Sequence, residues 1–146
     1  MVRDPENLAN TRATYDRVAA EYAAHIADEL AGKPLDRALL ACFAEQVDGM
    51  GTVVDMGCGP GHVAVSLHGL GVPMIGVDLS PEMVTVARQR APHIAFEQGS
   101  MLALATPDAA WGGIVAFYSI IQSEWPAVRS SKFTTSIEKA SARKMA

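Results

Sequence analysis

The first fifty residues have apolar side chains at helical spacing. Between residues 6 and 30, apolar positions recur every three or four residues with charged residues mostly between them, which predicts an amphipathic helix. Residues 35–47 repeat this pattern, and Gly32 and Pro34 separate the two helices. The predicted apolar faces are Tyr15, Val18, Ala19, Tyr22 and Ile26 in the first helix, and Leu35, Leu39, Leu40, Phe43 and Val47 in the second.

From residue 52 onward, short β-branched and apolar runs alternate with helical stretches. Ser80 and Pro81 form a helix start, because Ser is a preferred N-cap and Pro suits the first turn. Strands that alternate with helices predict an α/β fold with a parallel sheet and helices on both faces. The predicted strands are 52–56, 73–78, 94–97 and 113–118, and the predicted helices are 62–70 and 81–90.

A glycine-rich segment, Gly57-Cys58-Gly59-Pro60-Gly61, lies between the first predicted strand and the following helix. A nucleotide-binding loop requires this context. Glycines without Cβ atoms let the backbone turn sharply and approach a ligand, and the helix N-terminus points free N–H groups at the same place. This segment, residues 57–61, is called the glycine loop below.

Two acidic residues end the first and second predicted strands. Asp55 lies two residues before Gly57, where its carboxylate can accept hydrogen bonds or face a cationic ligand. Asp78 follows 23 residues later, a position that suits the two ribose hydroxyls of a nucleoside. The alternative for each is a helix or turn cap, which is less favoured for the pair than for either residue alone.

These segments resemble the class I S-adenosylmethionine-dependent methyltransferases. Residues 53–61 and 76–83 are similar to the first two motifs of that family, and residues 97–101 and 113–121 to its third contact loop and fourth strand. Residues 11–23 resemble the lid helix that precedes the core in small-molecule members. The resemblance covers about residues 8–122. It implies a Rossmann-like methyltransferase fold with an incomplete parallel sheet of about four strands, preceded by N-terminal lid helices.

The resemblance also implies a binding site for the cofactor S-adenosylmethionine. Asp55 would face the methionine amino group, the glycine loop would pack against the methionine and ribose portions, and Asp78 would hold the ribose hydroxyls. Further contacts are expected at the adenine, at the sulfonium and in the lid. For Tyr15, Tyr22 and Phe117, ordinary packing is the alternative. The expected cofactor-binding residues are Asp55, Gly57, Cys58, Gly59, Gly61 and Asp78; Leu79, Met83, Ser100 and Met101 around the adenine; Phe117, with Tyr118, at the sulfonium; and Tyr15 and Tyr22 in the lid.

The implied chemistry needs few catalytic side chains. The cofactor carries an activated methyl group, so the protein must mainly align it with the acceptor. A general base is needed only for an acceptor that is protonated at the working pH. His25 and His62 are candidates, with ordinary surface positions as the alternative, and no catalytic residue is assigned. The four histidines lack metal-ligand spacing, so no metal site is expected.

Composition narrows the class of protein. The 146 residues suit one domain, and apolar residues make up 49% of them, which favours a folded core. The net charge of −4 argues against a nucleic-acid partner. No transmembrane stretch or secretory leader is visible, and two cysteines are too few for a disulfide framework, so a cytoplasmic protein with reduced thiols is expected.

The composition changes near residue 122. Residues 1–122 hold 7 basic and 14 acidic side chains, whereas residues 123–146 hold 5 basic and 2 acidic ones and five serines. We therefore expect lid helices over 1–50, a cofactor-binding core over 51–122, and an atypical basic tail over 123–146 that replaces the second half of the fold. The fourth strand would then have an unpaired apolar edge, which predicts a homodimer through that edge and the tail.

Three readings of function remain open. The favoured one is a methyltransferase for an unidentified small molecule, with activity impaired by the missing half. The second is an inactive remnant that binds S-adenosylmethionine or its demethylated product, or that only self-associates. The third is a nicotinamide-dinucleotide-binding domain, which is disfavoured because His62 stands where the third glycine of that motif belongs and because Asp55 fits a pyrophosphate poorly.

Overall fold

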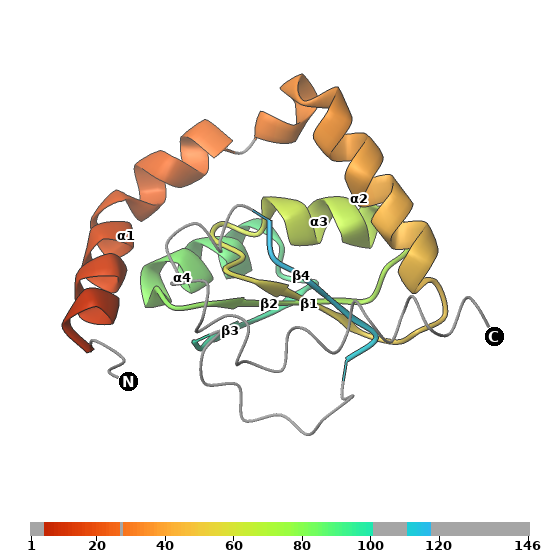
Figure 1. Ribbon diagram of the computed structural model, residues 1–146. Helices are drawn as coiled ribbons and strands as arrows, with labels where there is room; N and C mark the ends of the chain where they lie inside the picture. The colour runs from red at the N-terminus through yellow and green to blue at the C-terminus, as the bar shows by residue number, and fades with distance from the viewer. Residues whose placement is uncertain (1–4, 27, 101–110, 118–146) are drawn as a thin grey trace.

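The fold was analysed in a computed structural model that describes residues 5–26, 28–100 and 111–117. Three helical segments precede alternating strands and helices (Figure 1). None of the described helices is long and apolar enough to cross a membrane. The elements are α1 (Pro5–Ile26), the 3-10 helix η1 (Glu29–Gly32), α2 (Pro34–Val47), β1 (Val53–Met56), α3 (His62–Gly69), β2 (Met74–Asp78), α4 (Pro81–Arg90), β3 (Ala95–Gln98) and β4 (Gly113–Val115).

The four described strands form one parallel sheet in the order β3-β2-β1-β4. The parallel α/β fold predicted from the sequence is confirmed. In the register of the sheet, Asp55 pairs with Gly76 on one side and with Val115 on the other. Because the strands are parallel, their carboxyl ends meet at one edge of the sheet, and the glycine loop begins there. Self-association through the β4 edge stays a prediction.

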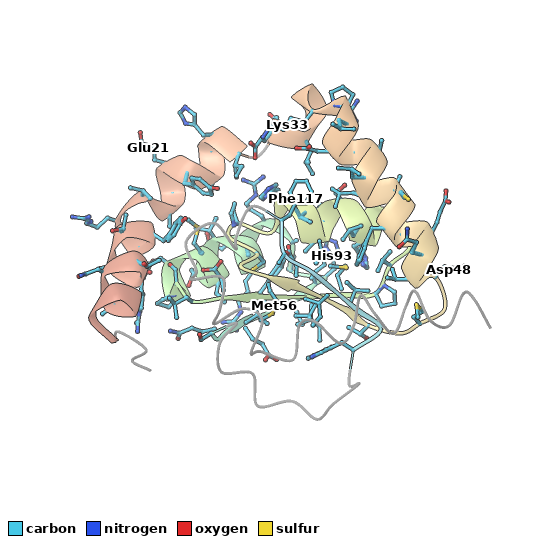
Figure 2. The ribbon with its side chains drawn as sticks, in the orientation of Figure 1. Glu21, Lys33, Asp48, Met56, His93 and Phe117 are labelled. Atoms are coloured by element: carbon cyan, nitrogen blue, oxygen red, sulfur yellow. The ribbon has the colours of Figure 1, made fainter. Side chains whose placement is uncertain are left out.

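Side chains of β1 alternate between two apolar clusters. Val53 faces the larger cluster, to which α2, α3 and α4 contribute Leu40, Leu67 and Ala87. Val54 and Met56 face the opposite side of the sheet, with Val77. Figure 2 shows Phe117 on the side of the helices and Met56 on the other side. Helices were predicted on both faces, and the helices in the described part of the chain cover one of them.

The N-terminal helices depart from the predicted boundaries. The first was expected to reach residue 30, but α1 ends at Ile26 and the chain turns through η1. Bonds from Ala31 N–H to the Asp28 carbonyl and from Lys33 N–H to the Leu30 carbonyl close this tight turn. The turn allows α1 and α2 to form an arch with η1 at its top (Figure 1). The helix spacing is retained in both, but a helix pattern cannot locate such a turn.

Part of the predicted apolar face of α2 is exposed. Leu35 and Leu39 are 70% and 55% exposed, whereas Leu40, Ala44 and Val47 are buried. The physical reason is the tilt of α2. Its C-terminal half packs against the core, and its N-terminal half rises away from the sheet toward η1 (Figure 1). The last predicted strand is also shorter than expected, since β4 ends at Val115, and Tyr118 lies outside the described residues.

Phe96 on β3 supports the sheet where the loop and α4 meet. A Cβ atom at Gly76 would lie 2.3 Å from Phe96 Cδ1, and one at Gly61 would lie 2.8 Å from Phe96 Cζ. Both distances are shorter than any real contact between carbon atoms. The ring of Phe96, itself 2% exposed, therefore occupies space that only glycine leaves free on β2 and at the end of the glycine loop.

This packing predicts that Gly76→Ala destabilises the protein by about 1–3 kcal/mol, the usual cost of overfilling a packed core. Gly69→Ala is the matched control, because nothing lies within 4 Å of a Cβ at that helical position. The control should leave the urea midpoint unchanged or raise it, since Ala favours helix. Equal midpoints for the two variants would contradict the role given to Phe96.

Candidate functional site

The glycine loop is folded back onto β2. The N–H groups of Gly57 and Cys58 both donate to the carbonyl of Val77, at 2.8 and 3.1 Å. Gly57, Gly59 and Gly61 have φ values of 73°, 51° and 85°, in the left-handed region that side chains with a Cβ rarely adopt. The three alternating glycines are therefore required by the backbone path of this loop.

Asp78, at the end of β2, fastens the loop to the sheet. One carboxylate oxygen accepts a hydrogen bond from Gly59 N–H at 2.8 Å, and the other accepts from Ser80 N–H at 2.9 Å. Burial raises the pKa of Asp78 above its ordinary value, and the negative charge of Asp16 adds to the rise, while these hydrogen bonds oppose it. Asp78 thus holds the loop in shape and brings a carboxylate to its rim.

Asp55, at the end of β1, is a buried carboxylate with one unsatisfied oxygen. Its side chain is 2% exposed and accepts a hydrogen bond from the backbone N–H of Ala64 in α3. The other oxygen, Oδ2, has no hydrogen-bond partner in the described part of the chain. Burial, with the charge of Asp78 as a second cause, raises the pKa of Asp55 to about 7. Such an oxygen is suited to a cationic or hydrogen-bond-donating ligand.

Helix α1 covers this edge of the sheet and adds a third carboxylate. Asp16 accepts a hydrogen bond from the hydroxyl of Ser80, which in turn caps α4 by accepting from Met83 N–H at 3.2 Å. Farther along the same pair of helices, Arg90 Nη1 donates to the carbonyl of Ala23 at 2.9 Å. Asp16, Asp55 and Asp78 together are called the acidic site below.

Two tyrosines of α1 lie near the glycine loop, as the lid interpretation expects. A Cβ atom at Gly59 would be 3.9 Å from Tyr22 Cε1, and the rings of Tyr15 and Tyr22 meet edge to face with centroids 6.3 Å apart. Burial raises the pKa of both phenols, and the charge of Asp78 adds to each. Both tyrosines therefore lie close enough to the acidic site for the charge of Asp78 to raise the pKa of their phenols.

Other residues expected to bind the cofactor lie in different surroundings. Cys58 is 2% exposed within the larger core cluster, and burial raises the pKa of its thiol far above the ordinary range, so it is an inert protonated thiol. Met83 is 1% exposed, so protein atoms already cover the surface that it was expected to offer to an adenine. Leu79, Ser100 and Phe117 are partly exposed. Met101 lies outside the described residues.

The structure adds a cluster that the sequence analysis did not identify. Glu29 of η1 forms an ion pair with Lys33, and its Oε2 lies 3.9 Å from His62 Nε2. We call Glu29, Lys33 and His62 the histidine cluster. The four-residue spacing of Glu29 and Lys33 is a sequence signal for their pairing, but nothing in the sequence points from them to His62. His25, the other candidate base, is exposed on α1.

A separate surface groove lies away from these residues. It has a volume of about 800 Å³ and is lined by residues such as Val47, Gly51 and Pro73, near the amino ends of β1 and β2. It contains no member of the acidic site or of the histidine cluster.

Comparison with known proteins shows which family the chain matches. Residues 53–137, more than half of the chain, match the family described as "Methyltransferase domain". The chain belongs to this methyltransferase-domain family. The resemblance to class I S-adenosylmethionine-dependent methyltransferases is thereby confirmed. The family match begins at the first residue of β1 and runs beyond residue 122, so it includes part of the segment predicted to be an atypical tail.

Two curated relatives of this methyltransferase domain carry different names. A trans-aconitate 2-methyltransferase of Rhizobium meliloti is 36% identical over 59 residues, which are 39% of this chain and 23% of that protein. A demethylmenaquinone methyltransferase of Chlorobaculum parvum is 40% identical over 48 residues, which are 32% of this chain and 20% of that protein. The chain thus matches less than a quarter of the length of either relative.

A solved structure matches nearly the whole length of the chain. Magnesium protoporphyrin IX methyltransferase from Synechocystis PCC 6803, solved with bound SAM, matches 96% of this chain and 74% of that one, with a TM-score of 0.70 and 14% identity. At this identity the likeness supports the Rossmann-like methyltransferase fold alone.

The raised pKa of Asp55 predicts a pH-dependent effect of Asp55→Asn on stability. Because the folded-state pKa of about 7 exceeds the ordinary 3.8, the contribution of Asp55 to stability is complete below pH 4 and is lost as the pH rises through 7. At pH 8 the ionised carboxylate costs on the order of 4 kcal/mol. The neutral amide keeps an acceptor for Ala64 N–H, so Asp55→Asn should be more stable than wild type at pH 8.

The measurement is urea unfolding of both proteins at several pH values. The advantage of Asp55→Asn should shrink from pH 8 toward pH 5. A variant that is less stable than wild type at pH 8 would show that the carboxylate has a stabilising partner.

Proposed function

We propose that this domain binds S-adenosylmethionine between the glycine loop and α1, and that the protein transfers the methyl group to a small molecule. The observation that carries the proposal is the unsatisfied Oδ2 of Asp55 in a site with two further carboxylates. S-adenosylmethionine carries two positive groups, an ammonium and a sulfonium. A buried anionic site favours such a ligand, because each uncompensated charge in it is costly without a cation.

The residues present fit this cofactor. Asp55 Oδ2 is free to accept a hydrogen bond from the ammonium. The carboxylate of Asp78 has about four lone-pair sites, and the backbone N–H groups of Gly59, Ser80 and Leu79 act on it, so a site remains for a ribose hydroxyl. At Gly59 the loop leaves space for a ligand, because a Cβ atom there would meet only Tyr22 Cε1, at 3.9 Å. Tyr22 on α1 is placed to cover a ligand held there.

When bound, the cofactor supplies an activated methyl group, so the chemistry needs no strong protein nucleophile. The residues of this chain position the cofactor and enclose it. Asp55 and Asp78 hold the two ends of the ligand at fixed points of a rigid sheet, and α1 excludes water from above. Orientation of this kind is worth up to about 7–11 kcal/mol of the barrier in ideal intramolecular systems.

The same geometry disfavours a dinucleotide. A pyrophosphate at the glycine loop would meet the carboxyl group of Asp55, and a negative charge there repels a phosphate. The relatives support methyl transfer, and their names indicate different acceptors, so the acceptor does not follow from them. Neither the geometry nor the relatives favour the inactive-remnant alternative.

The proposal predicts micromolar binding of S-adenosylmethionine and S-adenosylhomocysteine in a calorimetric titration, with no binding of NAD. Asp78→Asn should weaken binding by about 10- to 100-fold, because hydrogen bonds to a charged group are worth about 1.5–3 kcal/mol. Asn retains an acceptor for the loop, which limits damage to the fold.

Glu45→Gln is the matched control, since Glu45 is an exposed acidic residue on α2 that lines the separate groove and not the acidic site. It should bind both ligands as wild type does. Absence of binding by the folded wild-type protein, or equal binding of NAD, would contradict the proposal.

A further inference from the structure

The histidine cluster lies next to the proposed cofactor site and has no role in holding the cofactor. His62 is the first residue of α3 and follows directly on Gly61 of the glycine loop. Its side chain is 15% exposed. Nε2 faces Glu29, while Nδ1 is buried and has no hydrogen-bond partner among the described residues. His62 therefore has a carboxylate near one ring nitrogen and no hydrogen-bond partner at the other among the described residues.

The surroundings of the ring favour one neutral tautomer. A carboxylate near Nε2 attracts an N–H at that nitrogen, and an unpaired lone pair at Nδ1 is less costly to bury than an unpaired N–H. Burial lowers the pKa of His62 below 6.5, with Arg90 and Lys33 lowering it further and Glu29 raising it. The ring is neutral at pH 7, with Nδ1 as the available proton acceptor.

Tyr22 connects the histidine cluster with the acidic site. The charges of Glu29, Lys33 and Asp78 all act on its phenol, and its ring lies over Gly59. His62 follows Gly59 by three residues, so its backbone adjoins the segment of the glycine loop that Tyr22 would cover. Nδ1 is buried in the structure, so an acceptor reaches it only after the protein atoms that cover it move aside.

We propose that His62 is the general base of the reaction and that the methyl acceptor is a hydroxyl or thiol compound that is protonated at neutral pH. This inference rests on the proposed function. A carboxylate acceptor is already ionised at pH 7 and would make no use of a base, whereas a phenol, an alcohol or most thiols must lose a proton.

The proposed step is balanced. The acceptor oxygen or sulfur forms a bond to the methyl carbon as the methyl–sulfur bond of the cofactor breaks and its electron pair stays on that sulfur. The acceptor proton passes to His62 Nδ1. The resulting imidazolium faces Glu29, whose carboxylate stabilises the new charge through Nε2–H. The proton then leaves to solvent.

The first test reads the ring directly and needs no acceptor. In protein labelled with ¹⁵N-histidine, NMR should show His62 neutral at pH 7 with the proton on Nε2. Glu29→Gln should shift its titration to lower pH, because a nearby negative charge is removed, and Lys33→Met should shift it to higher pH. A charged ring at pH 7, a proton on Nδ1, or unmoved titrations in both variants would overturn the proposal.

The second test measures methyl transfer to a series of phenols and thiophenols of graded acidity at pH 8. His62→Asn should lower the rate by about 100-fold for weakly acidic phenols, within the range usual for general bases. For phenols that are ionised at this pH the loss should be less than about threefold. In wild type, kcat/KM should fall as the pH drops through the pKa of His62, and the variant should lose this dependence.

His68→Asn is the matched control, since His68 is exposed on the same helix. It should retain both the rate and the pH profile. A loss in His62→Asn that is uniform across the phenol series would indicate a structural role and overturn the proposal.

Binding of S-adenosylhomocysteine separates the two proposals. Wild type and His62→Asn should bind it equally, because His62 does not hold the cofactor. If wild type binds it but methylates no phenol, alcohol or thiol in the series, the base assignment fails while the cofactor site stands. If wild type does not bind it, the proposed function itself fails, and with it the role of His62.

Discussion

The structure depends on negative charge buried at the carboxyl ends of β1 and β2. Burial and the charge of Asp78 raise the pKa of Asp55, and burial and the charge of Asp16, which α1 brings to the same place, raise the pKa of Asp78. A protein built only for stability would put apolar residues at such positions. Their presence, with one carboxylate oxygen unsatisfied among the described residues, supports the proposal that a positively charged ligand completes the site. The family membership and the proposed cofactor agree with this physical requirement.

The rest of the fold fixes the positions of these carboxylates. Phe96 fits against Gly61 and Gly76, and the carbonyl of Val77 holds the start of the glycine loop. Asp78 accepts the hydrogen bond from Gly59 N–H that holds the loop, and in the proposed site the same carboxylate would bind the ligand. Structure and binding thus share the same atoms, so a change at Asp78 affects the shape of the loop and the affinity together.

Much of this arrangement was predictable from the sequence. Strand and helix periods located β1, β2, α3 and α4, and the spacing of Asp55, the glycines and Asp78 indicated a nucleoside site, because these features are local. The exposure of Leu35 and Leu39 was not predictable, since it depends on the tilt of α2 relative to the sheet. The burial of Cys58 and Met83, and the approach of Glu29 to His62, likewise depend on packing between distant segments.

The most direct test of the central claim is the number of protons released when the ligand binds. Calorimetric titration of S-adenosylhomocysteine at pH 7, in buffers of different ionisation enthalpy, measures it. With a pKa of about 7, Asp55 is about half protonated in the free protein, and a bound ammonium should drive it to the carboxylate. Wild type should release about half a proton, and Asp55→Asn none. Equal proton release in the two proteins would contradict the account.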